Sequence, residues 1–386
     1  MTIMEESYQP LTGIRVIEVS HMIMGPSAGF FLASLGAEVI KIEPPDGDKT
    51  RKLTGMGRGF YPSFNRGKKS VVLDTHTVEG LATLHDLINT ADVFLENFRD
   101  VSMEKMGLAP AQLQEKYPTL IIASCKGFLQ GPYENRTAMD EVVQMMTGMA
   151  YMTGPKGRPL RIGSSTVDIT GGLFTAFGVL AALFKRQQDG QGHQIRTGLF
   201  ESCLLLVMQH MVQFDLEGTE SPPMPNREFS WPIYDIFTTQ DSKSIFIGAI
   251  TTGHWDIVCR LLGLEHLLTD ARLQTRMDQI NNREWTIPIV EAAVAARTYA
   301  ELTPILEQQG IPFGPVSRPV EMYADPHVNR PNGLLTSVDN ETGQAYRAPG
   351  LPLEVDGQPL FPEQADLAAI GEHTEAVLAE LAARKA

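Results

Sequence analysis

Short apolar runs alternate with longer amphipathic stretches over the first 130 residues. Five of the runs are rich in β-branched side chains and predict strands, at residues 14–19, 37–43, 70–74, 92–98 and 120–124. Helices are predicted between them, among others at 25–36 and 78–91. Because strands that alternate with helices usually pair in parallel, the pattern predicts an α/β fold with a doubly wound parallel sheet.

The rest of the chain divides at two groups of turn-forming residues. Residues 139–188 are mostly helical in pattern, with an interruption at 154–165, and an apolar helix is predicted from about 200 to 214. The segment EGTESPPMPNR (217–227) predicts a linker. A smaller unit follows, with strands near 234–238 and 244–249 and helices near residues 254, 285 and 300. The second group, IPFGPVSRPVEMYADPHVNRPNG (311–333), closes that unit. A hairpin around 339–343 and a helix from residue 372 are expected to end the chain.

Charge and composition narrow the range of partners. Acidic side chains outnumber basic ones by 46 to 32, and the formal net charge over 386 residues is −14. A field of that sign repels nucleic acids and anionic membrane surfaces, so we expect neither as a partner. It still allows a local basic patch to bind an anionic small molecule. Hydrophobic residues make up 43% of the chain, which supports a sizeable core.

Cysteine usage and the N-terminal segment predict a reduced, cytoplasmic protein. The three cysteines lie far apart and form no CxxC pair. The segment MTIMEESYQPLTG lacks the basic and apolar regions of a signal peptide, and no uninterrupted apolar run reaches the ~18 residues of a membrane span. The nine histidines form no HExxH or HxH pattern and no ligand-spaced pair with a cysteine, so we expect no metal site.

The first strand–helix–strand unit has the position of a dinucleotide site but lacks its glycines. HMIMGPSAG stands where a nicotinamide- or flavin-binding protein carries GxGxxG. Without those glycines a pyrophosphate cannot approach the helix backbone closely. Glu43 ends the second predicted strand, where a ribose-binding acid would lie, and is then expected to face solvent.

The segment GPSAG (25–29) fits the GxSxG motif of serine hydrolases. That motif requires the strand to lead directly into the turn. Residues 21–24 intervene here, and Pro26 is typical of a first helical turn. We therefore expect these small residues to let the helix pack closely on the sheet, with no nucleophilic serine.

A basic run stands out against the acidic composition. Seven basic residues and no acid lie between Lys49 and Lys69. Arg99, Lys105 and Lys126 follow near the ends of predicted strands. Because ligands of open α/β sheets bind at the carboxyl ends of the strands, these cations could converge on a phosphorylated ligand. The alternative is a solvated basic face, which such runs usually form.

Asp168, in SSTVDITGG, lies at the start of a predicted helix and has two interpretations. It can cap the helix. It can instead be a nucleophile oriented by the helix N-terminus, with Gly171 and Gly172 letting a bulky substrate approach. With an ordinary pKa of about 3.9 the carboxylate would be ionised at neutral pH without a partner base. The residues alone leave both interpretations open.

Six stretches spread over nearly the whole chain carry a resemblance to a known family. They are LTGIRVIEVSHMIMGPSAGFFLASLGAEVIKIEPPDGD, NRGKKSVVLD, DVFLENF, GFLQGPYENRTAMDEVVQMMTGMAYMTG, DITGGLFTAFGVLAAL and GIPFGPVSRPVEMYADP. Together they resemble the family III CoA-transferases, the group of formyl-CoA transferase and carnitine CoA-transferase. The resemblance implies a Rossmann-like large CoA-binding domain from residues 1–220 and 330–386, and an inserted small α+β domain at 226–325. It also implies an interlocked homodimer of ring-shaped subunits.

The same resemblance assigns the site. It implies Asp168 as nucleophile, acyl-CoA and a small carboxylic acid as substrates, and no tightly bound cofactor. Contacts to the coenzyme are expected at Ile23, Met24, Leu73, Asp74, Thr75, His76, Asn97, Phe98, Arg99 and Lys105. The implied reaction is CoA transfer through an aspartyl anhydride and an aspartyl-CoA thioester. Backbone N–H groups near Gly171 and Gly172 could stabilise the oxyanion, and Asp140 could position the site or cap a helix.

Departures from the family pattern bear on the substrate. Formyl-CoA transferase has glutamine at Ile23, arginine at Pro44, a lysine and a tyrosine near Thr137 and Met139, and a glycine-rich lid; all are missing here, which argues against oxalate or formate. A short dicarboxylate such as succinate could pair with Arg161 or Arg227. The alternative function is that of the α-methylacyl-CoA racemases of the same superfamily, which use a histidine at the Met139 position as a second base.

Overall fold

The computed structural model describes residues 8–226, 231–360 and 365–385. The chain divides into two compact units, Met1–Ser221 with Asn329–Ala386, and Pro222–Val328.

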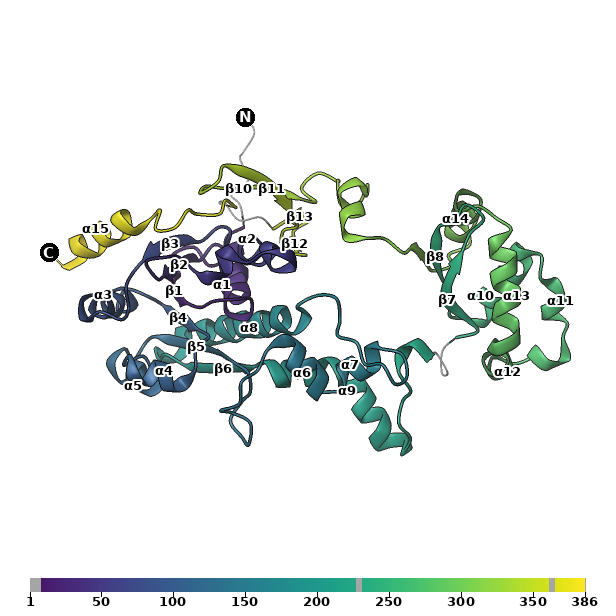
Figure 1. Cartoon of the computed structure of the whole chain (residues 1–386), viewed down its shortest axis with the longest axis horizontal. Coiled ribbons are helices and arrows are strands. Elements are labelled where there is room, and N and C mark those ends of the chain that lie inside the picture. Colours follow the sequence, from purple (N-terminus) through teal and green to yellow (C-terminus); the bar gives the residue numbers. More distant parts are fainter. Residues whose placement is uncertain (1–7, 227–230, 361–364, 386) are drawn as a thin grey trace. The chain divides into compact units, whose positions relative to one another are not determined.

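The first unit is built on a parallel six-stranded sheet in the order β3-β2-β1-β4-β5-β6, which runs from top to bottom in Figure 1. The strands are β1 (Arg15–Val19), β2 (Glu38–Glu43), β3 (Lys69–Val72), β4 (Val93–Glu96), β5 (Ile121–Lys126) and β6 (Gln194–Gly198). This is the strand order of a doubly wound fold, so the predicted α/β class is confirmed. The sixth strand was not predicted, because QIRTG lies at the edge of the sheet, mostly half-buried, and lacks an apolar run.

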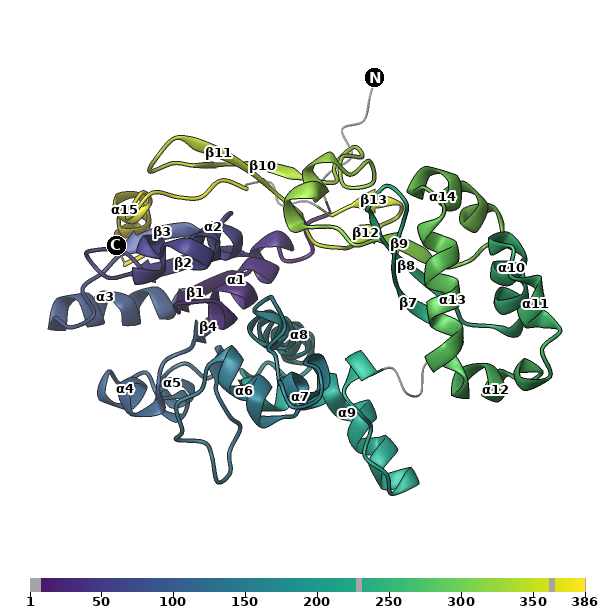
Figure 2. The ribbon, with the colours of Figure 1, turned by 45° about the vertical axis from the view of Figure 1, so that its right-hand side comes forward.

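One face of this sheet is covered by α1 (Met24–Ser34) and α8 (Thr166–Asp189), which pack on each other (Figure 2). α6 (Asp140–Met146), α7 (Met149–Thr153) and α9 (Leu199–Glu217) extend this layer. Alternate strand residues point to the two faces, so Val16 joins this core while Ile17 joins the core on the other face. By length and composition α8 could cross a membrane. Its packing against α1, β5 and α9 also accounts for an apolar helix, as in the core of a soluble domain.

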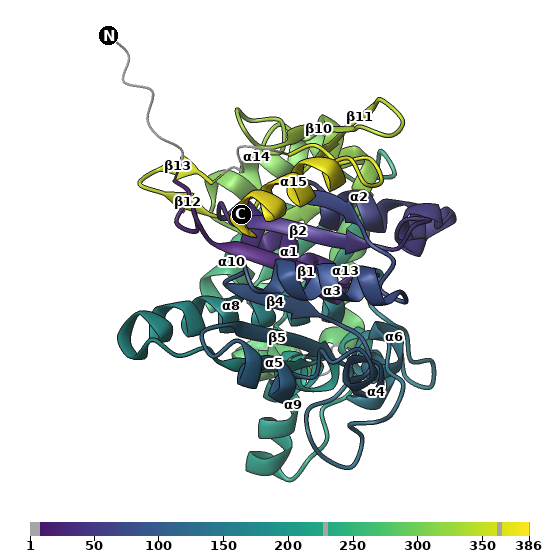
Figure 3. The same ribbon diagram turned by 90° about the vertical axis from the view of Figure 1, so that its left-hand side faces the viewer.

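The other face is covered by helices from both ends of the chain. They are α3 (Val78–Ile88), α4 (Asp100–Lys105), α5 (Pro110–Lys116) and α15 (Thr374–Lys385). Figure 3 shows α3 and α15 in front of the strands. α15 inserts Val377 and Leu381 into this core, so the C-terminal segment completes the first unit.

The connection from β2 to β3 contains η1 (Lys49–Lys52), η2 (Gly55–Gly59) and α2 (Phe60–Asn65). The C-terminal part of the unit also contains an antiparallel hairpin of β10 (Leu335–Asp339) and β11 (Gln344–Ala348), and a short pair of β12 (Glu354–Val355) and β13 (Gln358–Pro359). The hairpin lies where the sequence predicted it.

The second unit has an antiparallel sheet in the order β7-β8-β9, formed by β7 (Ile233–Thr238), β8 (Ser244–Ala249) and β9 (Phe313–Pro315). Its helices are α10 (Thr252–Leu262), α11 (Glu265–Leu268), α12 (Arg276–Asn281), α13 (Arg283–Ala295) and α14 (Tyr299–Gln308). The short turn η4 (Ala271–Leu273) connects α11 to α12, whereas η3 (Met224–Asn226) precedes β7 and η5 (Pro319–Ala324) follows β9. Sheet and helices share one core around the buried Trp255.

Candidate active site

Asp168 is the third residue of α8, and the acid that caps this helix comes from α6. The Oδ2 atom of Asp140 accepts hydrogen bonds from the backbone N–H groups of Val167 (2.8 Å) and Asp168 (3.2 Å). Ser165, at the N-cap position, makes no side-chain capping bond. The interpretation of Asp168 as a cap is therefore wrong, because Asp140 satisfies the free N–H groups of the first turn.

The carboxylate of Asp168 makes no hydrogen bond and no ion pair within the described part of the chain. Burial and the nearby charge of Asp140 together raise its pKa to about 7, although Arg161 acts in the opposite direction. The expected ordinary pKa is thus wrong, because the carboxyl has lost much of its water and faces a second acid. A carboxyl shifted in this way by burial and a specific charge is a candidate functional group.

Arg161 and Gln144 surround Asp140. The Nη2 atom of Arg161 lies 3.8 Å from Oδ1 of Asp140, and its Nη1 atom lies 3.5 Å from Oε2 of Glu141. Arg161 also donates to the carbonyl of Ser164 (3.2 Å). The amide of Gln144 donates to Oδ1 of Asp140 at 2.6 Å. These contacts connect the segment before α8 to α6 and fix the Asp140 carboxylate.

Gly171 and Gly172 allow α8 to pack against α1. A Cβ at Gly171 would lie 2.7 Å from Cε of Met24, and one at Gly172 would lie 2.0 Å from Oγ of Ser27. Both glycines are buried inside the helix, where their N–H groups belong to its hydrogen-bond ladder. The predicted roles in substrate access and oxyanion binding are therefore wrong. Ser27 donates to the carbonyls of Met24 (2.9 Å) and, more weakly, Asp168 (3.4 Å), which confirms the packing interpretation of GPSAG.

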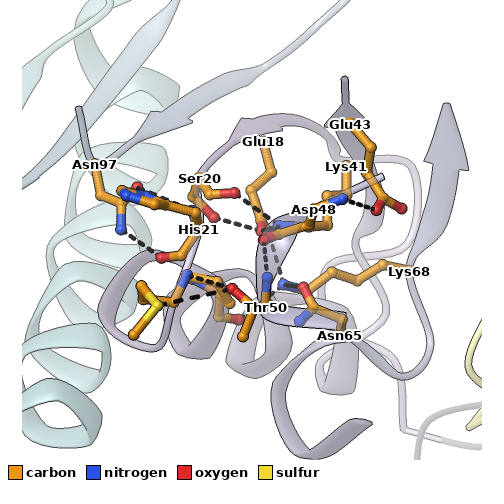
Figure 4. Close-up of polar contacts among 12 residues, drawn as sticks. Glu18, Ser20, His21, Lys41, Glu43, Asp48, Thr50, Asn65, Lys68 and Asn97 are labelled. Carbon is orange, nitrogen blue, oxygen red and sulfur yellow. Dashed lines mark hydrogen bonds and ion pairs between the residues drawn. The ribbon is translucent and has the colours of Figure 1, made fainter. Parts of the chain in front are cut away.

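The turn from β1 to α1 is held from two sides (Figure 4). The Asn97 amide accepts from the backbone N–H of His21 (3.0 Å) and donates to the carbonyl of His21 (2.8 Å). The rings of His21 and Phe98 stack with centroids 4.9 Å apart. Met22 has a φ of 62°, in the left-handed region, and its N–H donates to Oγ1 of Thr50 (3.2 Å). His21 and Thr50 were not predicted as site residues, because no local sequence pattern marks either contact.

The predicted coenzyme residues follow the carboxyl ends of strands but form two groups, with Lys105 apart from both at the end of α4. The group after the adjacent strands β1 and β4 contains Ile23, Met24, Asn97, Phe98 and Arg99. The group after β3 contains Leu73, Asp74, Thr75 and His76, three strand spacings from β4, or roughly 14 Å. A ligand that touches both groups must therefore be extended along this edge of the sheet.

The predicted contact residues also differ in how far their side chains are exposed to solvent. The side chains of Ile23, Met24 and Leu73 are buried, so they can meet a ligand only through their backbone. Arg99 and Lys105 are exposed, and Nη2 of Arg99 donates to Oγ1 of Thr137 (2.8 Å). These two cations are thus the exposed charges among the predicted contacts.

Part of the basic run supplies internal counterions. Nζ of Lys68 lies 2.7 Å from Oε2 of Glu18, and Nη2 of Arg51 lies 2.7 Å from Oε1 of Glu43. Lys41 bridges Glu18 (3.4 Å) and Asp48 (3.1 Å), as Figure 4 shows for part of this network. The run was predicted to form either a ligand site or a solvated basic face. Arg51 and Lys68 do neither, because they are paired with buried acids.

Glu43 is fully buried, so its predicted exposure to solvent is wrong. Burial raises the pKa of this carboxyl, but the Arg51 guanidinium and the Ser70 hydroxyl outweigh burial and lower it to about 2. Lys126 is likewise paired, with Glu96 and Asp100 at 2.8 Å each. The exposed cations of the run are Lys49, Lys52 and Arg58.

Met139 is the residue that the resemblance aligns with the racemase histidine. It is the N-cap residue of α6 and is exposed, and a thioether cannot carry a proton between bases.

Among the described residues, no group of three His, Cys, Asp or Glu side chains is placed to hold a metal ion.

Comparison with known proteins identifies the family. The family model of CoA-transferase family III matches residues 11–374. A succinate–glutarate CoA-transferase from Agrobacterium fabrum is 31% identical over 394 aligned positions, which cover 99% of this chain and 98% of the relative. An acetyl-CoA:oxalate CoA-transferase from Acetobacter aceti is 30% identical, with coverages of 98% and 97%. The crystal structure of a CAIB/BAIF family protein from Brucella suis superposes with a TM-score of 0.86 at 28% identity, covering 97% of this chain and all of that one. The chain therefore belongs to CoA-transferase family III, and it is a CoA-transferase.

Proposed function

We propose that this enzyme moves CoA from an acyl-CoA to a carboxylic acid with Asp168 as the nucleophile. The observation that carries the proposal is that Asp140 caps α8 and Asp168 does not. Asp140 takes the capping hydrogen bonds of α8, which leaves the Asp168 carboxylate without a partner among the described residues. A carboxylate held at a helix N-terminus and not used for structure is available to attack a carbonyl.

The first half of the reaction charges the enzyme. An oxygen of Asp168 attacks the acyl carbonyl of the donor, forming a C–O bond while the C–S bond breaks and CoA leaves as thiolate. The product is an aspartyl–acyl anhydride. The thiolate then attacks the Asp168 carbonyl carbon, a C–S bond forms, and the donor acid leaves as carboxylate. Asp168 now carries CoA as a thioester, so the thioester energy is retained.

The second half runs the same steps with the acceptor. The acceptor carboxylate attacks the aspartyl thioester and releases CoA thiolate, which gives a new anhydride. The thiolate attacks the acceptor's carbonyl carbon, the anhydride C–O bond breaks, and acceptor acyl-CoA leaves. Asp168 is regenerated as a carboxylate. CoA is thus a substrate of both halves and is not tightly bound between turnovers.

Peptide mass spectrometry after incubation with a panel of acyl-CoAs, including succinyl-CoA and acetyl-CoA, tests the proposal. The peptide that contains Asp168 should gain the mass of CoA and lose it to hydroxylamine. Asp168→Asn should form no adduct and lose transferase activity by at least about a thousand-fold. An unmodified wild-type peptide together with exchange of the C2 proton in a branched acyl-CoA would instead support the racemase.

The proposed acceptor is a short dicarboxylate such as succinate. The names of the Agrobacterium fabrum and Acetobacter aceti relatives include succinate, glutarate and oxalate, all of which are dicarboxylates. Arg161 is the cation near Asp168 that could pair with a second carboxylate. Arg227, the other candidate, lies outside the described residues. If Arg161→Glu uses succinate as well as the wild type does, Arg161 does not bind the acceptor.

We propose that the enzyme is a homodimer. Exposed apolar side chains follow α8 and α9, and they include Leu173, Phe177, Phe184, Met208, Met211, Phe214 and Leu216. A stripe of this kind on a water-soluble chain usually marks a protein interface. Light scattering coupled to size exclusion should give twice the chain mass of 42.5 kDa. A monomer at micromolar concentration would contradict this assignment.

A further inference from the structure

We propose that Asp140 is a positioning residue whose fixed negative charge, opposed by Arg161, sets the pH at which Asp168 becomes a nucleophile. The inference rests on the proposed function, since it concerns the same carboxylate. It goes further, because it proposes that Asp140 and Arg161 control the ionisation of Asp168. Capping of α8 alone does not require such control.

The geometry fixes the charge of Asp140 beside Asp168. Its Oδ2 atom accepts from the backbone N–H of Asp168 itself and from that of Val167. Its Oδ1 atom accepts from the amide of Gln144, 2.6 Å away. Both carboxylate oxygens are therefore engaged, and the side chain is buried. A carboxylate held by three hydrogen bonds cannot turn away from its neighbour, so its charge acts on Asp168 at a constant distance.

Few other charges face Asp168 from the elements packed around it. α1 carries no titratable side chain over Met24–Ser34. α8 itself has no other charged residue before Lys185. α9 contributes Cys203, a thiol whose pKa is raised by burial. β5 contributes Cys125, whose thiol pKa burial raises to about 12, and Lys126, which is paired with Glu96 and Asp100. α6 contributes Asp140 and Glu141, and the segment before α8 contributes Arg161.

The two charges closest to Asp168 therefore oppose one another. Asp140 disfavours a second negative charge, and Arg161 favours it. Glu141 is more than half exposed and contacts Arg161, so solvent screens its charge from Asp168. A purely structural cap would hold α8 in place equally well at every pH. A charged cap beside the nucleophile changes the fraction of Asp168 that is ionised.

Three variants separate these roles. Asp140→Asn removes the charge and keeps an oxygen that can accept hydrogen bonds, Arg161→Gln removes the opposing charge, and Glu141→Gln is the matched control. Initial rates of CoA-adduct formation on Asp168 are measured from pH 5 to 9. The midpoint of the rise in rate should move to lower pH by about one unit in Asp140→Asn and to higher pH by a similar amount in Arg161→Gln. It should stay within about 0.3 units in Glu141→Gln.

Equal midpoints in the wild type, Asp140→Asn and Arg161→Gln would overturn the proposal and leave Asp140 as a cap only. A lower rate without a shifted midpoint has the same meaning. If Asp140→Asn does not fold, the shift in Arg161→Gln decides, because that side chain is partly exposed and its loss should be tolerated.

A thermal measurement distinguishes this failure from failure of the proposed function. The difference in Tm between the wild type and Asp168→Asn, followed against pH, reports the ionisation of Asp168 without any substrate. The same difference is measured in the Arg161→Gln background, where its transition should move to higher pH. If the wild type forms no CoA adduct, the proposed function fails, and an unmoved thermal transition would then overturn the role of the charges as well.

Discussion

Two clusters of buried carboxylates in the first unit balance their charges differently. Around β1 and β2, three acids face three bases; we call this the ion-pair network, and it contains Glu18, Glu43, Asp48, Lys41, Arg51 and Lys68. At the start of α8, Asp140 and Asp168 face the single guanidinium of Arg161, which Glu141 shares.

The difference is visible in the ionisation of single carboxyls. Burial raises the pKa of Glu43, but Arg51 and further hydrogen bonds lower it to about 2. Burial and Asp140 raise the pKa of Asp168 to about 7, and Arg161 only partly offsets them. The network thus uses its acids for structure. At the start of α8, the pKa of Asp168 lies near neutral pH, where binding of a proton or a substrate can change the charge of the carboxyl.

The largest effect is expected from removing one base of the network. Lys68→Met leaves Glu18 buried with only Lys41 as a cation, at 3.4 Å. Breaking a fully buried ion pair from one side costs about 3–5 kcal/mol, so the free energy of unfolding in urea should fall by about that amount. The control is Lys69→Met, which removes a partly exposed base paired with Glu38 and should cost less than about 1 kcal/mol.

A double variant sharpens the same test. Adding Glu18→Gln to Lys68→Met removes the uncompensated charge and should restore a large part of the lost stability. If the double variant is as unstable as Lys68→Met, packing of the lysine stem, and not charge, stabilises this part of the fold.

The next effect concerns the packing that places Asp168. In Gly172→Ala the new Cβ would lie 2.7 Å from the carbonyl oxygen of Met24 and 2.9 Å from the backbone nitrogen of Ala28. Because backbone cannot move aside cheaply, α8 should shift away from α1, with a loss of about 2 kcal/mol in unfolding free energy and a slower adduct formation on Asp168. Gly163→Ala, whose Cβ would meet no atom within 4 Å, is the control and should leave both quantities unchanged.

A smaller effect, of opposite sign at the two places, is expected in the pH dependence of stability. The pKa of Asp168 is raised in the folded state, so its contribution to stability is present below about pH 4 and is lost as pH rises to 7. Asp168→Asn should therefore be more stable than the wild type at pH 8, by about 1–2 kcal/mol after allowing for residual solvent. Equal Tm values at pH 8 would contradict the raised pKa.

Glu43 provides the comparison within the network. Its pKa is lowered in the folded state, so its contribution is present above about pH 4.5 and is lost as pH falls toward 2. Glu43→Gln should thus lose stability at pH 7 and show a weaker acid dependence than the wild type. Tm measured from pH 2 to 8 for the two variants gives both slopes.

The sequence predicted the parts of this molecule that depend on local pattern. Five of the six strands of the large sheet follow from their apolar runs, whereas β6 at the edge has none. Asp168 was found, and Asp140 was named as a positioning residue or a helix cap, but the sequence did not show that it caps α8, because it precedes Asp168 by 28 residues. The Lys68–Glu18 pair joins residues 50 positions apart, and the Asn97–His21 contact joins residues 76 apart. Such contacts are made by the tertiary fold, and neither the charge count nor the periodicity of the sequence shows which residues pair.

The smallest effect tests whether the ion-pair network supports the turn between β1 and α1, where contacts to the coenzyme are expected. Asp48 accepts from the backbone N–H of Thr50 (2.8 Å), and Thr50 holds the N–H of Met22, whose φ of 62° is strained for a side-chain-bearing residue. Thr50→Val keeps the shape but leaves that N–H unpaired, at a cost of about 1 kcal/mol. Because the turn leads into Ile23 and the start of α1, the KM for acyl-CoA should rise several-fold while kcat changes little. Thr50→Ser, which keeps the hydroxyl, should restore the KM; a KM unchanged in Thr50→Val would mean that the network serves stability alone.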